Sequence, residues 1–261
     1  MLYFDISKSP GLQTLVTMAK EHHTAEILTA PPSPPQFATM KETSKSPLAN
    51  PAPLAMGGFA TTLLTLSLAM MNFRGVTVQT FFIANLCFVA CVGLLISAQW
   101  AMVQGDTFTY TVLTAFGLFY GGYGTVIMPS LHVAESYGGF TPQYYNAFGF
   151  FVLIWAVLNL FFLLASIRIS IVYIMVFACI ELCLIFDGSS QFAKADGNDD
   201  MYARLQTAAG AFGFLAGLLG YYSTAHYLCQ DALGFELPMG DTSHWSLTKK
   251  NKTHLNKDLE V

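Results

Sequence analysis

Long apolar stretches alternate with short polar ones over most of this chain, from residue 53 to residue 229. Each stretch is near or above the ~20 residues that an α-helix needs to cross the hydrocarbon core of a bilayer. Lipid offers no hydrogen bonds to the backbone, so helices are predicted rather than open strands. The sequence therefore predicts an all-α membrane protein with a six-transmembrane-helix bundle. The predicted spans are 53–72, 81–103, 107–129, 147–167, 169–187 and 203–229.

Polar segments flank the predicted bundle and suggest three parts. Residues 1–49 form a polar tail, predicted to be largely disordered because it is rich in proline at 31–35 and poor in apolar side chains. The six-helix domain covers 50–235, and a polar C-terminal tail covers 236–261. An even number of spans puts both tails on one side, and the distribution of Lys and Arg favours cytoplasmic termini. We expect a multi-pass protein of the plasma membrane.

Composition narrows the functional classes. Hydrophobic residues make up 54% of the chain and charged residues 11%, against about 25% charged in soluble domains. Without a basic block, no nucleic-acid partner is expected. The cysteine pairs Cys87/Cys91 and Cys179/Cys183 lie in apolar runs and are predicted to be packing residues rather than metal ligands. No catalytic motif is found, so we expect no enzyme activity, no metal and no cofactor.

The most informative string is Asn50-Pro51-Ala52-Pro53-Leu54, directly before the first span. Asparagine is a good N-cap, and proline is tolerated in the first turn of a helix. The unpaired N–H groups of that turn, together with the helix dipole, attract anions. The string thus fits a carboxylate-binding terminus, and it equally fits an ordinary helix start at the membrane interface.

The same string, followed by residues 58–64, resembles the signature of the acetate uptake transporter family. That family includes bacterial succinate–acetate permeases and fungal acetate and ammonia-export-related membrane proteins. Further similarities recur downstream in the order and spacing of the family, so that the resemblance covers Asn50 to Gly240. These supporting segments are 105–108, 145–151, 208–210, 220–222 and 237–240.

The resemblance implies one pore per protomer in a ring-shaped homo-oligomer, a hexamer in relatives. It implies transport of small, acetate-like monocarboxylates, by an anion channel or a proton-coupled permease. In relatives the residue matching Phe59 forms the pore constriction with a tyrosine, which is Phe116 here, and an apolar residue of the fifth helix. This chain departs from the family at Phe116, which lacks the hydroxyl, and at Ala101, which replaces a glutamate of fungal relatives. Both changes make the predicted path less polar.

Several polar side chains within the spans are candidates for the path. Besides Asn50, we expect Thr61, Thr62 and Tyr120 to line it, because uncharged polar groups can replace water around a carboxylate without trapping it. Glu181 lies within the fifth span, where an ionisable group is costly and often functional, and it is the candidate for proton coupling. The alternative for each is a hydrogen bond that joins neighbouring helices.

A second function of a different class remains open on the sequence. The same fold could serve a non-transporting membrane sensor or scaffold, for example in the response to acid or ammonium. The proline-rich residues 31–35 favour this alternative, because such segments recruit partners. The glycines 210, 213, 217 and 220 share one face of the last span and are predicted to be a packing stripe.

Overall fold

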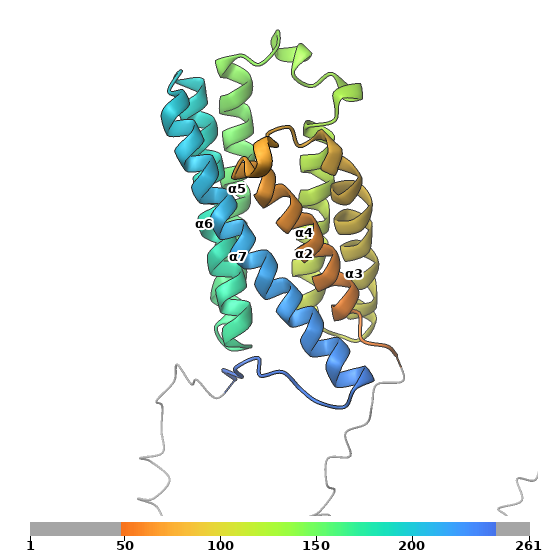
Figure 1. Ribbon diagram of the computed structural model, residues 1–261. Coiled ribbons are helices and arrows are strands. Elements are labelled where there is room, and N and C mark those ends of the chain that lie inside the picture. Colours follow the sequence, from red (N-terminus) through yellow and green to blue (C-terminus); the bar gives the residue numbers. More distant parts are fainter. Residues whose placement is uncertain (1–47, 244–261) are drawn as a thin grey trace, which may run out of the picture. The chain divides into compact units, whose positions relative to one another are not determined.

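The structure, a computed structural model, describes residues 48–243, and residues 1–47 and 244–261, with the proline-rich segment, lie outside it. Its core is a bundle of six helical stretches in antiparallel succession (Figure 1). The second stretch is composite, consisting of η3, a π-helix η4 and α3. The predicted six-helix bundle is confirmed. The elements are α2 (Ala52–Met70), η2 (Phe73–Gly75), η3 (Thr80–Phe82), η4 (Asn85–Val92), α3 (Gly93–Val103), α4 (Thr107–Val126), η5 (Pro129–Leu131), η6 (Glu135–Tyr137), α5 (Pro142–Ser166), α6 (Ile171–Ala195) and α7 (Asp199–Ala232).

α5 and α6 extend furthest beyond the apolar stretches that predicted them, and α7 also exceeds its predicted stretch by a few residues at each end. α5 begins at Pro142 rather than residue 147, because Thr141 caps it with Oγ1 accepting from the Tyr144 N–H at 3.4 Å. α6 continues past residue 187 to Ala195, and Gly197, with φ +74°, turns the chain into α7. These extensions are polar, so apolarity alone placed the ends wrongly, and capping groups mark the actual ends.

Four helical stretches are long and apolar enough to cross a membrane: Ala52–Met70, Thr80–Val103, Pro142–Ser166 and Ile171–Ala195. α4 and α7 are long enough but richer in polar residues, several of which are buried against other helices. Examples are Tyr120 and Tyr123 in α4 and Gln206 and Ser223 in α7. The protein is thus a membrane protein whose two most polar helices carry polar groups toward the bundle interior.

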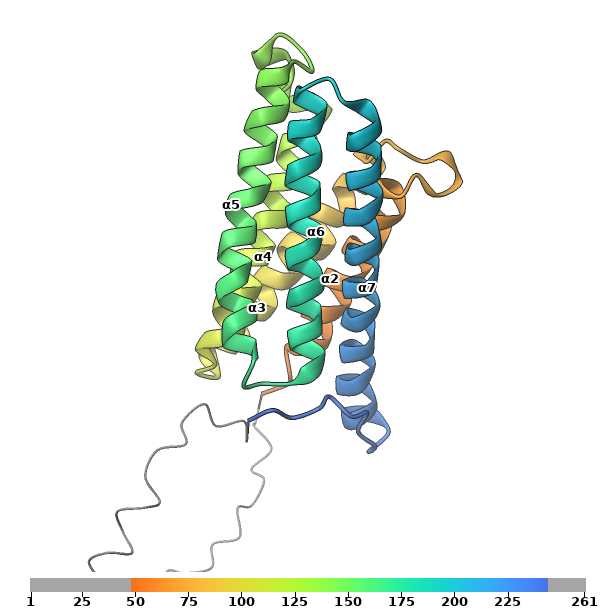
Figure 2. The same cartoon turned by 90° about the vertical axis from the view of Figure 1, so that its left-hand side faces the viewer.

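The helices form two layers, with α5, α6 and α7 in front of α2, α3 and α4 in Figure 2. α7 approaches α2 through the predicted glycine stripe. A Cβ on Gly217 would lie 2.6 Å from the Leu64 Cγ, and one on Gly210 would lie 2.8 Å from the Ser67 carbonyl oxygen. Neither position can hold a side chain without separating the helices, so the packing prediction is confirmed.

A second close approach joins the π-helix η4 to α4. A Cβ on Gly121 would lie 2.8 Å from the Cys91 Sγ, and one on Gly124 would lie 3.0 Å from the Cys87 Sγ. The first cysteine pair therefore fills the space above two glycines. Its predicted role as small packing residues is confirmed.

The start of the predicted C-terminal tail folds back onto the bundle. The Ile171 N–H donates to the Gly240 carbonyl at 2.8 Å, and the Tyr222 hydroxyl donates to the Pro238 carbonyl at 2.8 Å. Thr242 is buried. These bonds tie the segment to the beginning of α6 and to α7, at the end of the bundle where α2 begins.

Candidate functional site: three cavities in line

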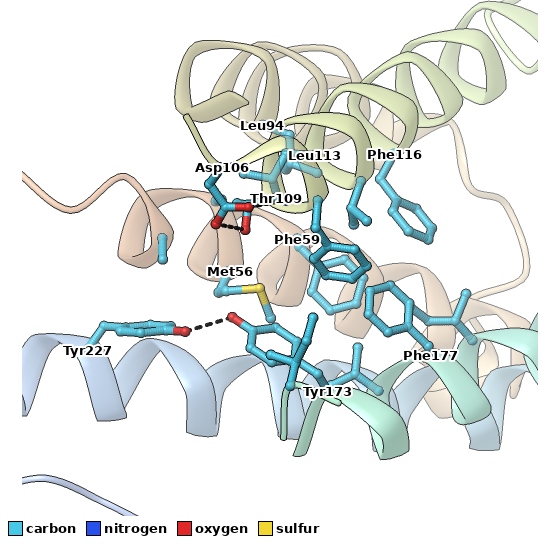
Figure 3. A pocket seen from close by; sticks show the side chains of 17 residues that line it. Met56, Phe59, Leu94, Asp106, Thr109, Leu113, Phe116, Tyr173, Phe177 and Tyr227 are labelled. Carbon is cyan, nitrogen blue, oxygen red and sulfur yellow. Dashed lines mark hydrogen bonds between the residues drawn. The ribbon is translucent and has the colours of Figure 1, made fainter. Parts of the chain in front are cut away.

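A cavity of about 370 Å³ lies between α2, α4 and α6 at the end where α2 begins (Figure 3). We call it the proximal cavity. Most of its walls are apolar, and its polar groups are already paired: Asp106 accepts from the Thr109 N–H at 3.0 Å, and the hydroxyls of Tyr173 and Tyr227 are 2.9 Å apart. Its lining residues are Ala52, Ala55, Met56, Phe59, Leu94, Asp106, Phe108, Thr109, Val112, Leu113, Phe116, Ile169, Tyr173, Val176, Phe177, Ile180 and Tyr227.

The proximal cavity ends at three side chains that we call the apolar ring: Phe59 from α2, Phe116 from α4 and Ile180 from α6. The two phenylalanine rings meet edge to face, with centroids 6.4 Å apart. Phe116 also stacks on Phe177 at 6.3 Å. Such aromatic contacts contribute about 0.5–1.5 kcal/mol each beyond the area they bury. They hold the ring residues in place between the helices.

Beyond the apolar ring lies a smaller space of about 50 Å³, the central cavity. This volume suffices for one or a few water-sized groups. The apolar ring lines both the proximal and the central cavity, so the two are adjacent. The other residues that line the central cavity are Leu63, Leu66, Met70, Phe119, Tyr120, Tyr123, Cys183, Leu184 and Asp187.

A third space of about 450 Å³, the distal cavity, lies at the opposite end of the bundle. Tyr123 lines both the central and the distal cavity, and its hydroxyl donates to the Gln79 Oε1 at 2.8 Å. The segment between α4 and α5, the green loop that arches over this end in Figure 1, forms part of the wall. Polar residues of the wall are Thr77, Gln79, Thr80, Glu135, Tyr144, Tyr145, Gln191, Tyr202 and Gln206.

Glu135 marks the outer rim of the distal cavity. Its own backbone N–H and the neighbouring His132 lower the pKa of the Glu135 carboxyl. The His132 Nδ1 lies 3.3 Å from the Glu135 Oε1, and both side chains are exposed. The rim therefore carries a carboxylate at neutral pH.

Asp187 joins the central and distal cavities through hydrogen bonds. The Gln206 Nε2 donates to the Asp187 Oδ1 at 2.6 Å, and the Gln191 Nε2 donates to the same oxygen at 3.3 Å. Ser190 completes the group, accepting from the Gln206 Nε2 at 2.7 Å. The sequence prediction missed this group. The spacing of Asp187 and Gln191, one helical turn apart, was the one readable signal for it.

The structure brings three of the predicted path residues together. Phe59 and Phe116 are in contact, and Tyr120 lines the central cavity beside them. Ile180 of α6 lines the proximal and central cavities beside them, and its role as the apolar partner expected from the fifth span stays a prediction. Behind Phe59, a Cβ on Gly220 would lie 3.0 Å from two carbons of the Phe59 ring. The glycine stripe of α7 therefore leaves the space that this side chain occupies.

The motif residue Asn50 lies outside the three cavities. It is exposed, and its Oδ1 accepts from the Ala52 N–H at 2.9 Å. α2 begins at Ala52, with Pro51 at the capping position. Ala52 itself lines the proximal cavity, so the first turn of α2 faces the entrance although the asparagine side chain does not line it.

Thr61 and Thr62 also lie away from the three cavities and bond to other helices. The Thr61 Oγ1 donates to the Gly57 carbonyl at 2.7 Å and lies 2.9 Å from the Tyr221 hydroxyl of α7. The Thr62 Oγ1 donates to the Asn85 carbonyl at 3.2 Å. These contacts match the alternative of inter-helix hydrogen bonds.

Glu181 faces α5. Its Oε2 accepts from the Asn159 Nδ2 at 2.7 Å, and the same amide donates to the Phe177 carbonyl at 3.0 Å. Glu181 lines none of the three cavities. The geometry explains how a carboxyl is held within the fifth span, and its part in proton coupling stays a prediction.

Comparison with known proteins places the chain in a family. Residues 34–239 match the GPR1/FUN34/yaaH family. The acetate transporter protein patA of Aspergillus clavatus is 39% identical, over 76% of this chain and 80% of the relative. The patA protein of Penicillium expansum is 36% identical, over 79% of this chain and 84% of the relative.

The fold also matches a solved structure. The bacterial acetate channel SatP superposes with a TM-score of 0.63 at 23% identity, covering 74% of this chain and 99% of that chain. The resemblance found in the Asn50-Pro51-Ala52-Pro53-Leu54 string is thus confirmed. The chain belongs to the GPR1/FUN34/yaaH family.

Proposed function

We propose that this protein moves acetate, or a monocarboxylate of similar size, across a membrane through the three cavities. One observation carries the proposal: the proximal and central cavities share the apolar ring, and the central and distal cavities share Tyr123. The three spaces therefore follow one another through the bundle. The names of the patA relatives as acetate transporters support this choice of substrate.

The apolar ring would set the size and hydration of what passes. A solute must shed water to enter a ring of Phe59, Phe116 and Ile180, and the loss of water is costly for a charged group. Acetate has a single methyl group and a single carboxyl group, so it loses less hydration than a dicarboxylate. We therefore place selection for small monocarboxylates at this ring, with Tyr120 as the first hydroxyl beyond it.

Uptake of labelled acetate into liposomes tests the proposal. The purified full chain is reconstituted, and uptake is followed at acidic and at neutral pH. We expect uptake above that of protein-free vesicles, competition by other short monocarboxylates and little competition by a dicarboxylate. Equal uptake with and without protein would contradict the proposal.

The alternative of a non-transporting sensor or scaffold receives no support from the relatives, which include proteins named acetate transporter and acetate permease. The proline-rich residues that favoured it lie outside the described residues. Because these relatives are transporters, we also propose no catalytic activity. Deleting residues 1–45 separates the two functions, since transport should survive the deletion and partner-dependent sensing should fail.

We further propose that the protomers form a ring-shaped homo-oligomer, a hexamer, in the plasma membrane with both termini in the cytoplasm. Large apolar side chains exposed on α3 and α5, such as Trp100 and Phe161, are available for contacts with lipid or with another copy. Native mass spectrometry in detergent gives the subunit number. Accessibility of a C-terminal tag in intact cells gives the orientation.

A further inference from the structure

Asp187 lies between the central and distal cavities. Its side chain is 5% exposed and lines the central cavity. The two glutamines that donate to its Oδ1 come from different places, Gln191 from α6 itself and Gln206 from α7. Both glutamines line the distal cavity. The carboxyl is thus fixed by amides at the point where a solute would leave the central cavity.

The groups around Asp187 are neutral. α4 contributes Tyr120 and Tyr123, α7 contributes Tyr202, and Cys183 is one turn away on α6. α2 faces the central cavity with Leu63, Leu66 and Met70, whereas α5 contributes Tyr144 and Tyr145 to the distal cavity. Lys and Arg are missing among the described residues that line the three cavities. Glu135 is the charged residue that lines the distal cavity, at its outer rim, and Lys194 bonds to Asp199 and lies over the Tyr202 ring.

The two amide N–H groups that donate to the Asp187 Oδ1 favour its ionised form. A carboxylate at this point has a direct consequence for the solute. Two like charges in a poorly solvated space repel strongly. An acetate anion that reaches the central cavity would therefore meet the negative charge of Asp187. A neutral carboxylic acid meets no such barrier, because its O–H can donate a hydrogen bond to the carboxylate oxygen.

We propose that Asp187, held by Gln191 and Gln206, is a specificity-determining site that admits the neutral acid and rejects the carboxylate anion. The substrate then crosses with its proton, and no net charge moves. This inference rests on the proposed function and deepens it. It assigns selection by charge to Asp187, whereas the apolar ring selects by size.

The test separates charge movement from proton movement. Liposomes containing the full chain are given either a pH gradient or a membrane potential set by potassium and valinomycin, and labelled acetate uptake is measured. Wild-type uptake should follow the pH gradient and ignore the potential. In Asp187→Asn, which keeps the size and loses the charge, uptake should respond to the potential, rising about tenfold when the interior is made positive by about 60 mV. Asp187→Glu, which restores the carboxyl, should return to the wild-type pattern.

Several outcomes overturn the inference. Acetate uptake driven by the membrane potential in the wild type would overturn it. This measurement needs no variant, so the test remains valid if Asp187→Asn does not fold. The inference would also be overturned if folded Asp187→Asn still followed the pH gradient and ignored the membrane potential, as the wild type does. The same holds if uptake lost its dependence on the pH gradient in Glu181→Gln but kept it in Asp187→Asn. That result would assign proton coupling to Glu181. A wild type that moves no acetate above protein-free vesicles would instead contradict the proposed function.

Discussion

The two ends of the path through the bundle differ in chemistry. The proximal cavity is walled mainly by aromatic and aliphatic side chains, whereas the wall of the distal cavity combines apolar side chains with many amides and hydroxyls and a rim carboxylate. α6 contributes to both, with Val176 and Phe177 near its start and Gln191 near its end. The difference shows that one helix changes from apolar to polar along its length, and that the apolar ring lies on the apolar side of this change.

In the proposed path, the two ends have different roles. On the apolar side, passage would be limited by fit and by the loss of water. On the polar side, hydrogen bonds and charge would decide which form of the solute proceeds. The following substitutions act on one end at a time and are ordered from the largest expected effect to the smallest.

Filling the apolar ring should abolish transport. We expect Phe59→Trp to reduce acetate uptake to the level of protein-free liposomes, because the larger indole must fill the space between Phe116 and the α7 backbone at Gly220. The matched control is Phe161→Trp, since Phe161 is 62% exposed on the outer face of α5. If the two variants transport equally well, the ring is not the constriction.

Removing an amide from the polar side should cost stability. In Gln206→Leu the buried Asp187 carboxyl loses its shortest donor, and we expect the free energy of unfolding to fall by about 2–3 kcal/mol. The melting temperature in detergent measures the change. Gln230→Leu is the control in the same helix, because Gln230 is exposed and bonds to Glu236. Equal melting temperatures for both variants would mean that the Asp187 cluster does not stabilise the fold.

Adding a hydroxyl to the apolar ring should increase the rate of acetate transport. Phe116→Tyr offers a hydrogen bond to a passing carboxyl group, and a hydrogen bond of about 0.5–1.5 kcal/mol corresponds to about a two- to tenfold faster passage. Initial rates of acetate uptake measure it. A slower rate would indicate that the added oxygen obstructs the ring rather than assisting the solute.

The smallest effect is expected at the distal rim. Glu135→Gln removes a carboxylate that lowers the local concentration of acetate at this entrance, so the initial rate of acetate uptake into liposomes should rise by less than about twofold, an effect that salt screens. The pH dependence of the difference between wild type and variant follows from the lowered pKa of the Glu135 carboxyl. The charge is present at neutral pH and is lost as the pH falls through that pKa, so wild type and variant should converge at acidic pH. A difference that grows on acidification would contradict this account.

The six apolar stretches were enough to predict the helices of the bundle. The pairing of Phe59 with Phe116 was implied by the family resemblance, and the two rings do touch. Helix ends were less predictable, because capping by Thr141 and the polar extension of α6 do not follow apolarity. The exact lining of the path depends on helix rotation, which placed Thr61 and Thr62 against other helices.

The hydrogen-bonded group around Asp187 could not be predicted from the sequence. Asp187 stands where the apolar stretch of α6 stops, so it resembled a helix end at the membrane surface. Its closest donor, Gln206, belongs to the next helix, and only the α6–α7 turn at Gly197 brings the two together. Glu181 was conspicuous because apolar residues surround it in sequence, although in space it bonds to Asn159 of α5.

The contact between Gly220 and Phe59 limits how the passage can widen. The α7 backbone lies so close that the benzyl group of Phe59 cannot swing toward it without pushing the two layers apart. Rotation of Phe59 toward α7 therefore cannot open the proposed passage. A bulkier residue at Gly220 would press on the Phe59 ring and so act on the proposed passage without lining it.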